Sequence, residues 1–379
     1  MNKSSFTYKE ILRRIHNGIY RPGEKLPGEI AFAEELGISR VTLRIALKQL
    51  VSEGIVESYG RSGNYVSMNI PGKRFLLLIG GSTEQLGIVE QYLSSLLRQN
   101  LANAGHQLEL LAVSALKNIS LEEWNAMLAE SRIEGVFLGA NYTPEDSAIL
   151  HLFNHTTVPM IAVHGCEKSS IYHFPKVSGG GKECFMDGVR YLASLGHRRV
   201  CTIFSENNTR GIELELYREF LQCNGLSDDP RLIMGLSFSE TKAAVRQQLL
   251  GPEPPTAFMC FCDARAMQVY AAARELGMRI PGQISVMGMS GYSERLFAMP
   301  RLSMANFRYD LICAEAVKLM LRSAEWFGPG MEKIYITVPH SIEPYGSTGS
   351  APGMLCSDHL QECVSLRIFP TVSSFSGDE

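Results

Sequence analysis

Three cations are spaced along one short stretch of the chain in a pattern that suits contact with a nucleic acid. Arg40, Arg44 and Lys48 recur every four residues. Residues four apart lie on one side of an α-helix, and a guanidinium can donate two parallel hydrogen bonds to a guanine edge or bind a phosphate. A helix with cations in its N-terminal half therefore suits the major groove of a duplex. The alternative is the solvated face of an ordinary amphipathic helix.

A turn followed by a helix must position these cations. Gly37 can end a preceding helix, and Ser39 can accept a hydrogen bond from the free N–H groups of the next one. Apolar residues at i, i+3, i+4, i+7 and i+8 predict one buried stripe, and they are Leu43, Ala46, Leu47, Leu50 and Val51. Val41 and Ile45 project from the outer side of this helix. They either touch thymine methyl groups or are plain exposed apolar residues.

Length and composition limit the classes of protein to consider. A chain of 379 residues exceeds one typical domain, so we expect two or three. The first twenty residues carry charges without an apolar core, and no apolar run could span a bilayer. We therefore expect a cytoplasmic protein without membrane association. The nine cysteines are then expected to be reduced, and Cys260 and Cys262 favour core packing over metal binding, because no second pair follows at zinc-finger spacing.

The net charge of −3 is unevenly distributed. Residues 1–70 hold ten Lys and Arg against seven Asp and Glu, a balance of +3, which leaves −6 for the remainder. A positive N-terminal part points to a polyanionic partner for that part alone.

The N-terminal part, residues 1–69, reads as three helices and a hairpin. Apolar spacing predicts the first helix around residues 8–19 and a short second one from Pro27 to Leu36, before the cationic third helix. Residues 55–59 and 64–68 read as strands around the turn Gly60-Arg61-Ser62-Gly63. Three helices and a hairpin make a winged helix-turn-helix of the α+β class.

This part closely resembles the GntR family of bacterial regulators. The matching pieces are YKEI at 8–11, RPGEKLP at 21–27, LGISRVTLR at 36–44, LVSEG at 50–54 and the Gly-x-x-Gly wing. One departure is that Gly28-Glu29-Ile30 stands where the family usually has Ser-Glu-Arg, so one arginine contact to DNA is missing. The resemblance places the recognition helix on bases and the wing in the minor groove. The implied DNA-binding residues are Ser39, Arg40, Thr42, Arg44, Lys48, Tyr59, Arg61 and Gly63.

After a short linker at 70–74, strand-like and helical runs alternate through residues 75–346. Strands are predicted at 75–79, 108–113, 135–138, 160–163, 200–204, 257–261 and 285–289. Helices are predicted at 86–104, 121–131, 183–194, 214–223, 241–250 and 264–276. This alternation predicts α/β architecture with parallel sheets, and the length fits two doubly wound lobes with a cleft between them. Residues 347–379 look like a loosely ordered extension.

The order of these pieces resembles the LacI/GalR effector domain, which is built like a type I periplasmic binding protein. The resemblance rests on LASLGHRRV at 192–200, PPTA to CD at 254–263, ISVMGM at 284–289 and EPYGST at 343–348. A GntR head on such a body resembles the layout of arabinose repressors. The family fold implies a small molecule held between the lobes.

The positions that would grip a sugar depart from the family pattern. His164, Glu213, Cys262 and Ser290 stand where sugar-binding members have Asp, Arg, Asn and Asp. A simple aldose is therefore doubtful. Ligand-binding candidates by position are Ser82, Thr83, Gln85, His164, Arg210, Glu213, Asp263, Ser290 and Asn306, and for each a structural role is an equal alternative.

Nothing in the sequence points to catalysis, a cofactor or a metal. His197 is interpreted as shaping the turn before a strand, and His151 with His155 as part of a surface helix without a carboxylate to complete a metal site. No phosphate-binding loop, nucleophile elbow or Cys-His constellation is present.

The sequence thus predicts a homodimeric, ligand-responsive transcription regulator, most simply a repressor, whose affinity for an operator is set by a carbohydrate or a derivative. Two alternatives remain. The body serves only dimerisation and its cleft is vestigial, or the head is fused to an enzyme of the aminotransferase kind, which would need a Schiff-base lysine and pyridoxal phosphate.

Overall fold

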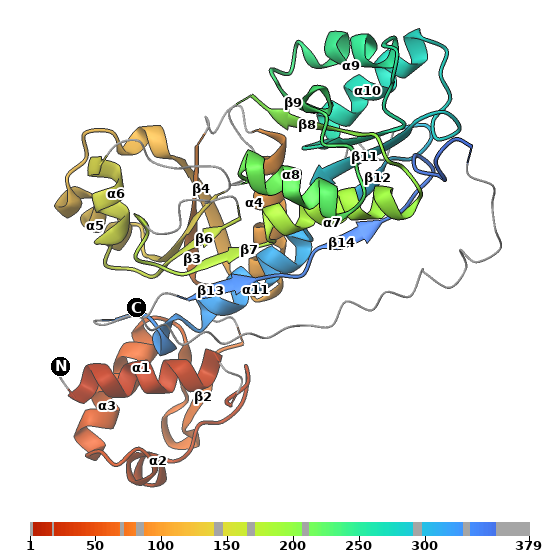
Figure 1. Cartoon of the computed structure of the whole chain (residues 1–379). Helices are drawn as coiled ribbons and strands as arrows, with labels where there is room; N and C mark the ends of the chain where they lie inside the picture. Colours follow the sequence, from red (N-terminus) through yellow and green to blue (C-terminus); the bar gives the residue numbers. More distant parts are fainter. Residues whose placement is uncertain are drawn as a thin grey trace. The chain divides into compact units, whose positions relative to one another are not determined.

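The computed structural model describes residues 3–16, 19–68, 72–80, 87–139, 147–164, 171–206, 212–290, 298–328 and 334–353. The chain divides into two compact units, the first of which contains the N-terminal 75 residues (Figure 1). Below, residues 3–68 are called the head and residues 74–353 the body. The predicted linker lies partly outside the described residues, as does most of the predicted C-terminal extension.

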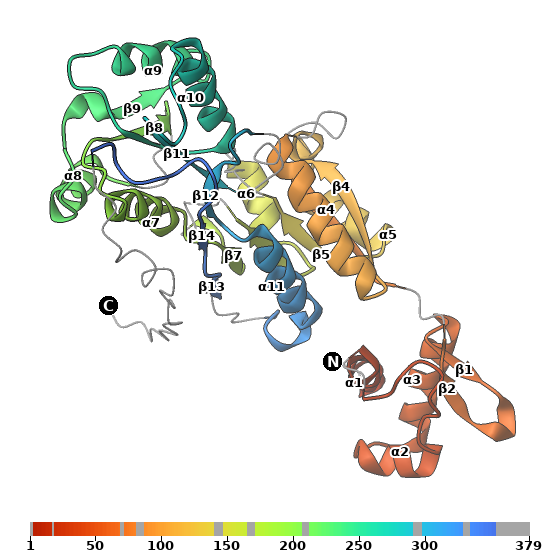
Figure 2. The same ribbon diagram turned by 90° about the vertical axis from the view of Figure 1, so that its right-hand side faces the viewer.

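The head is the expected winged helix-turn-helix, with its helices and hairpin visible in Figure 2. Its elements are α1 (Lys3–His16), α2 (Glu29–Glu35), α3 (Arg40–Ser52), β1 (Val56–Ser58) and β2 (Asn64–Val66). The two strands pair antiparallel, with Val56 opposite Val66, around a 3-10 turn. Both are shorter than predicted.

The sequence of α3 explains where this helix begins and which side it buries. The Ser39 side chain accepts a hydrogen bond from the Thr42 backbone N–H at 3.1 Å, which satisfies one of the free donors of the first turn. Leu43, Ala46, Leu47 and Leu50 are buried in the head core, as predicted. The prediction was wrong for Val51, which is 37% exposed, because this residue lies at the end of α3 and about a quarter turn away from the centre of the stripe.

The body contains two six-stranded sheets, one in each lobe. The first-lobe sheet has the order β13-β7-β6-β5-β3-β4, and the second-lobe sheet has the order β14-β12-β11-β10-β8-β9. The first-lobe strands are β3 (Arg74–Ile79), β4 (Gln107–Ala112), β5 (Ile133–Leu138), β6 (Met160–Val163), β7 (Lys176–Ser178) and β13 (Tyr335–Thr337). The second-lobe strands are β8 (Val200–Ser205), β9 (Ile233–Leu236), β10 (Ala257–Cys260), β11 (Ser285–Ser290), β12 (Ser303–Asn306) and β14 (Ser341–Glu343).

The pairing is parallel from β9 to β12, which confirms the predicted α/β architecture, but β14 runs antiparallel to β12. Helices α7 and α10 pack on opposite faces of the second-lobe sheet (Figures 1 and 2). The body helices are α4 (Ile88–Asn103), α5 (Leu121–Glu130), α6 (Ser147–Asn154), α7 (Gly181–Ser194), α8 (Leu214–Cys223), α9 (Thr241–Leu249), α10 (Asp263–Glu275) and α11 (Tyr309–Leu321).

The chain passes between the lobes three times. It crosses from β7 to α7, from β12 to α11 and from β13 to β14, because α7 packs on the second-lobe sheet and α11 on the first. The two lobes are therefore joined by three connections rather than one. The sequence prediction did not include β7, β9, β12, β13, β14 and α11, most of which are short.

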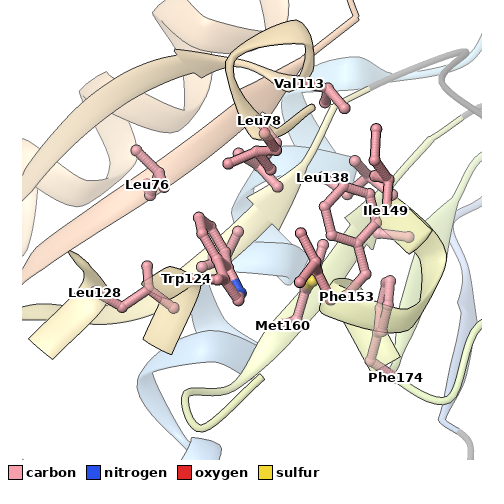
Figure 3. Close-up of a cluster of buried hydrophobic side chains, with 14 of the residues drawn as sticks. Leu76, Leu78, Val113, Trp124, Leu128, Leu138, Ile149, Phe153, Met160 and Phe174 are labelled. Carbon is pink, nitrogen blue, oxygen red and sulfur yellow. The ribbon is translucent and has the colours of Figure 1, made fainter. Parts of the chain in front are cut away.

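Figure 3 shows the core on one side of the first-lobe sheet. Trp124 of α5 and Phe153 of α6 are both buried there against Leu78, Leu138 and Met160 of the strands. Helix α5 begins with a capping box, in which Ser120 and Glu123 bond to each other's backbone N–H groups. Burial of these large side chains fixes the strands from which the candidate ligand residues extend.

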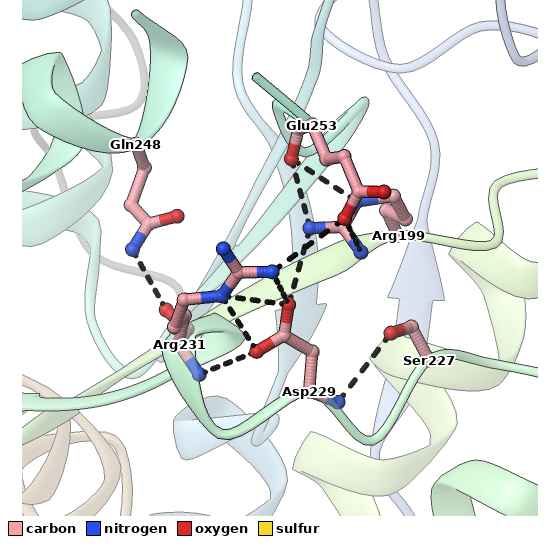
Figure 4. Close-up of polar contacts among 6 residues, drawn as sticks. All are labelled: Arg199, Ser227, Asp229, Arg231, Gln248 and Glu253. Carbon is pink, nitrogen blue, oxygen red and sulfur yellow. Dashed lines mark hydrogen bonds and ion pairs between the residues drawn. The ribbon is translucent and has the colours of Figure 1, made fainter. Parts of the chain in front are cut away.

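A charged network holds three loops together in the second lobe (Figure 4). Asp229 accepts hydrogen bonds from Arg199 at 3.3 Å and from Arg231 at 2.7 Å, and Arg199 also donates to the backbone carbonyl of Glu253 at 2.8 Å. These residues precede β8, β9 and β10. They therefore lie at the amino ends of the strands, opposite the edge where ligands of parallel α/β folds bind.

Candidate DNA-binding face and effector-binding residues

Two cations of the recognition helix share one carboxylate. Arg44 Nε donates to Glu29 Oε2 at 2.8 Å, and Arg40 Nη2 lies 3.7 Å from the same oxygen. All three side chains are partly exposed, so this link between α2 and α3 orients the guanidinium groups while leaving them accessible. Sequence analysis missed this role of Glu29, although the residue stands in the first turn of α2, beside the substituted family position Ile30.

The N-terminal turn of α3 also carries two hydroxyl groups. Ser39 Oγ and Thr42 Oγ1 lie 2.8 Å apart, and the Ser39 oxygen already caps the helix. Ser39 is exposed and Thr42 is half-buried at a helix N-terminus, where backbone N–H groups favour an anion such as a phosphate. The predicted assignment of these two residues to phosphates is compatible with this arrangement and stays a prediction.

The wing is held by an aromatic and charged cluster. The Tyr59 hydroxyl donates to Glu57, and this bond lowers the pKa of Glu57 and raises the pKa of Tyr59. The Tyr59 ring also packs edge-on against Tyr65, at 5.6 Å between centroids. Gly63 has φ 101°, a conformation that favours glycine. Arg61 lies in the turn, but its side chain is outside the described part of the structure.

His164 is buried in the first lobe. It is 2% exposed, and its Nε2 lies 3.1 Å from the Tyr309 hydroxyl, while its ring packs at 4.7 Å against both Tyr309 and Phe307. Its backbone has φ 58°. His164 is thus part of an aromatic cluster beside the β12–α11 connection. Sequence analysis missed both aromatic partners, because neither belongs to a recognisable motif.

Asn306 fixes the same connection. Its side-chain N–H group donates to Glu343 at 2.6 Å, and its side-chain oxygen accepts from the backbone N–H of Arg308 at 2.9 Å. Arg308 has φ 58° and forms an ion pair with Asp310 at 2.8 Å. The Asn306 amide is therefore used within the protein, which favours the structural alternative for this candidate.

Asp263 lies in the first turn of α10, at the carboxyl end of β10. It is fully buried, and a Cβ at Gly288 would come 3.0 Å from its Oδ1, so the glycine makes room for this carboxylate. Two residues later, Arg265 is 5% exposed and donates to Thr241 Oγ1 at 2.8 Å. A buried acid and a buried cation therefore lie two residues apart in the first turn of α10, at the edge where ligands of such folds bind.

Of the remaining effector candidates, the structure describes only the side chain of Glu213. Glu213 is an exposed residue at the N-terminus of α8 and makes no capping bond there. Ser82, Thr83, Gln85, Arg210 and the Ser290 side chain lie outside the described residues. The predicted ligand set is therefore only partly described.

His197 has the structural role that the sequence suggested. Its Nδ1 lies 2.9 Å from Thr256 Oγ1, and its Nε2 lies 3.0 Å from Ser285 Oγ and 3.1 Å from the Gly349 carbonyl. Burial lowers its pKa. The imidazole ties the beginnings of three strands to the C-terminal segment, away from the candidate ligand residues.

Neither the histidine pair nor the cysteine pair forms a metal site in the described part of the chain. The His151 and His155 rings lie 4.1 Å apart on α6, but no group of three potential ligands is found among the residues described. Cys260 is buried, and burial raises the pKa of Cys262. The described part of the chain also contains no helix with the length and apolar character needed to cross a membrane.

Comparisons with known proteins agree with this division into head and body. Residues 3–66 match the bacterial regulatory proteins of the gntR family, and residues 189–338 match the periplasmic binding protein-like domain. The chain joins a GntR-type head to a periplasmic binding protein-like body. The resemblance to both families that the motifs indicated is thereby confirmed.

Curated relatives of this GntR-headed chain are transcriptional repressors. The arabinose metabolism transcriptional repressor of Geobacillus stearothermophilus is 27% identical over 339 residues, which cover 84% of this chain and 90% of that protein. The repressor CytR of Escherichia coli is 29% identical over 225 residues, covering 58% of this chain and 64% of that protein. The chain is a homologue of DNA-binding transcription regulators, and these two relatives are regulators rather than enzymes.

Solved structures of LacI family regulators share the fold of the body. One from Bifidobacterium animalis is 20% identical with a TM-score of 0.58, covering 73% of this chain and 98% of that one. Another, from Enterococcus faecium with bound ribose, is 18% identical with a TM-score of 0.56, covering 73% and 99%. At this identity the likeness shows the fold alone.

Proposed function

We propose that this protein is a cytoplasmic repressor that binds a near-palindromic DNA operator as a homodimer and is controlled by a small molecule held between its two lobes. The observation that carries the proposal is the accessible cationic face of α3, on a GntR-type head joined to a body whose lobes are connected by three crossings. Dimer symmetry would be mirrored in the arrangement of the operator half-sites.

In this proposal the head divides its contacts between bases and backbone. Arg40 and Arg44 donate to guanine edges or phosphates, and the helix N-terminus holds a phosphate. The wing approaches the minor groove. The full set of proposed contacts is Ser39, Arg40, Thr42, Arg44, Lys48, Tyr59, Arg61 and Gly63.

The body would transmit ligand binding through its crossings. A ligand that contacts both lobes stabilises one lobe arrangement over another, and this changes the spacing of the two heads only if the two arrangements bind the ligand with different affinity. Asp263 is the candidate with the best position for a ligand hydroxyl group, because a buried carboxylate accepts strong hydrogen bonds. A carbohydrate or a derivative is the proposed class of ligand, and the relative concerned with arabinose metabolism supports it.

Fluorescence anisotropy tests this proposal. The full chain is titrated onto a labelled duplex selected from a random pool, and the titration is repeated with a panel of sugars and nucleosides. We expect salt-sensitive binding that at least one compound weakens. The sensor function is rejected if no compound changes DNA binding and no compound binds the protein.

A second candidate is a body that serves only dimerisation. The burial of His164 at a position where sugar-binding relatives have an acid favours it. Thermal shift measurements across a sugar and nucleoside library distinguish the two functions, since a vestigial body shows no ligand-dependent increase in its unfolding temperature.

A further inference from the structure

The outermost line of the recognition helix is apolar. At about 100° per residue, Val41 and Ile45 point about 170° and 150° away from the centre of the buried stripe defined above. Their exposed fractions agree, at 69% and 53%. The pole of the exposed face thus carries two β-branched side chains one turn apart.

Three cations lie beside these two residues, all on the same side of the line that the two form. Arg40 and Arg44 flank them on one side, and Lys48 continues the line one turn beyond Val41 and Ile45, all of them exposed. This arrangement complements a surface that is anionic along a border and has apolar points next to that border. The major groove has that character, because phosphates line it and the thymine 5-methyl group is the apolar point that it presents.

We propose that Val41 and Ile45 determine base specificity by packing against thymine methyl groups, so that each operator half-site contains two T·A pairs at positions facing these residues. The inference rests on the proposed binding of DNA and deepens it. The arginines then supply affinity and guanine contacts, while the two apolar side chains distinguish T·A from pairs without a methyl group in the groove.

Replacement of thymine by deoxyuridine tests the contact directly, since it removes only the methyl group and keeps every hydrogen-bonding atom of the base. The full chain is first used to select duplexes from a random pool. Each conserved thymine of a half-site is then changed to deoxyuridine, and affinity is measured by anisotropy. We expect conserved thymines at two positions and a loss of about fourfold in affinity for each methyl group removed.

Protein variants assign each methyl group to its side chain. Val41→Ala should bind the thymine and deoxyuridine duplexes equally at one position, and Ile45→Ala should do so at the other. Val51→Ala is the matched control, because Val51 is a partly exposed valine near the other end of α3. It lies about 15 Å from Val41 along the helix axis. It should keep the full sensitivity to deoxyuridine, and circular dichroism should show all three variants folded.

The outcomes separate this inference from the proposed function. The inference is overturned, while operator binding stands, if the selected duplex lacks conserved thymines. It is also overturned if replacing those thymines by deoxyuridine leaves the affinity unchanged. The inference is also overturned if Val41→Ala and Ile45→Ala keep the sensitivity of the unchanged protein. If no duplex is bound in a salt-sensitive manner, the proposed function itself fails.

Discussion

Single carboxylates organise charged side chains in both parts of this protein. Glu29 holds the two recognition arginines of the head, and Asp229 holds Arg199 and Arg231 in the second lobe. The first arrangement leaves the cations accessible and the second joins loops. A similar arrangement of charges therefore orients exposed cations of α3 in one place and joins loops in the other.

Arg44→Ala should weaken binding to the operator by roughly 10- to 100-fold, because a guanidinium contact to a guanine is worth about 1–3 kcal/mol. The slope of the logarithm of the affinity against the logarithm of the salt concentration should become shallower by at most about one. Anisotropy titrations at several salt concentrations measure both quantities. Arg246→Ala is the control, since Arg246 pairs with Glu275 at 3.1 Å on the body, and it should change neither. Equal losses in both variants would contradict the role of Arg44.

Asp229→Asn should lower the free energy of unfolding by about 1 kcal/mol at pH 7. Hydrogen bonds from Arg231 and Arg199 hold the pKa of Asp229 below its usual range. A carboxyl group whose pKa is depressed in the folded state stabilises the protein above its unfolded pKa of about 4 and loses this contribution as the pH falls. The difference in free energy of unfolding between the unchanged protein and Asp229→Asn, measured by urea denaturation, should therefore shrink from pH 6 to pH 3.

The neighbouring Asp228 offers the control for this experiment. It accepts one hydrogen bond from Gln222 at 2.7 Å and has no ion pair among the described residues. Asp228→Asn should change stability by only a few tenths of a kcal/mol at any pH in the range. A difference for Asp229→Asn that is independent of pH would contradict the assigned role of the ionised carboxylate.

At the scale of the element, α3 depends on both its cap and its stripe. Ser39→Ala removes the oxygen that accepts from Thr42 N–H, and it should destabilise the helix by about 1 kcal/mol. Hydrogen exchange of the full chain should then be faster in residues 40–52. Ser52→Ala is the matched control, because the Ser52 hydroxyl only donates to the Gln49 carbonyl near the other end of α3. Unchanged exchange in Ser39→Ala would contradict the capping role.

Sequence patterns predicted most of the helices and missed α11 together with several short strands. Strand β6 and helix α8 were predicted with their observed bounds, 160–163 and 214–223. The two strands nearest the C-terminus, β13 and β14, were not predicted. Each is only three residues long and exists through pairing with β7 and β12, from distant parts of the chain. Such pairing is a tertiary property that local periodicity does not record.

At the scale of the whole molecule, the crossings between the lobes are packed closely against each other. A Cβ at Gly179 would come 2.8 Å from the Phe307 carbonyl oxygen, so the β7–α7 crossing approaches the β12–α11 crossing at backbone distance. Gly180, the next residue, has φ 62°, which favours glycine. These two glycines allow two chain crossings to share one narrow place.

Gly179→Ala should lower the free energy of unfolding of the full chain by roughly 1–3 kcal/mol, because the added methyl group meets a backbone atom that has little room to move. Urea denaturation followed by circular dichroism measures this loss. Gly328→Ala adds the same methyl group where no atom lies within 4 Å, and it should be close to neutral. Equal stability of the two variants would show that the crossings are not tightly packed.

The sequence by itself determined the order of the parts and the chemistry of the head. The spacing of Leu43, Ala46, Leu47 and Leu50 identified the buried side of α3, and the cations on the same helix indicated the class of partner, because both are properties of a single helix. Only the tertiary structure decided that Glu29 holds two arginines, that His164 is buried against Tyr309, and that Gly179 faces Phe307. These contacts join residues 11 to 145 positions apart, and their formation depends on how whole elements pack rather than on any local pattern.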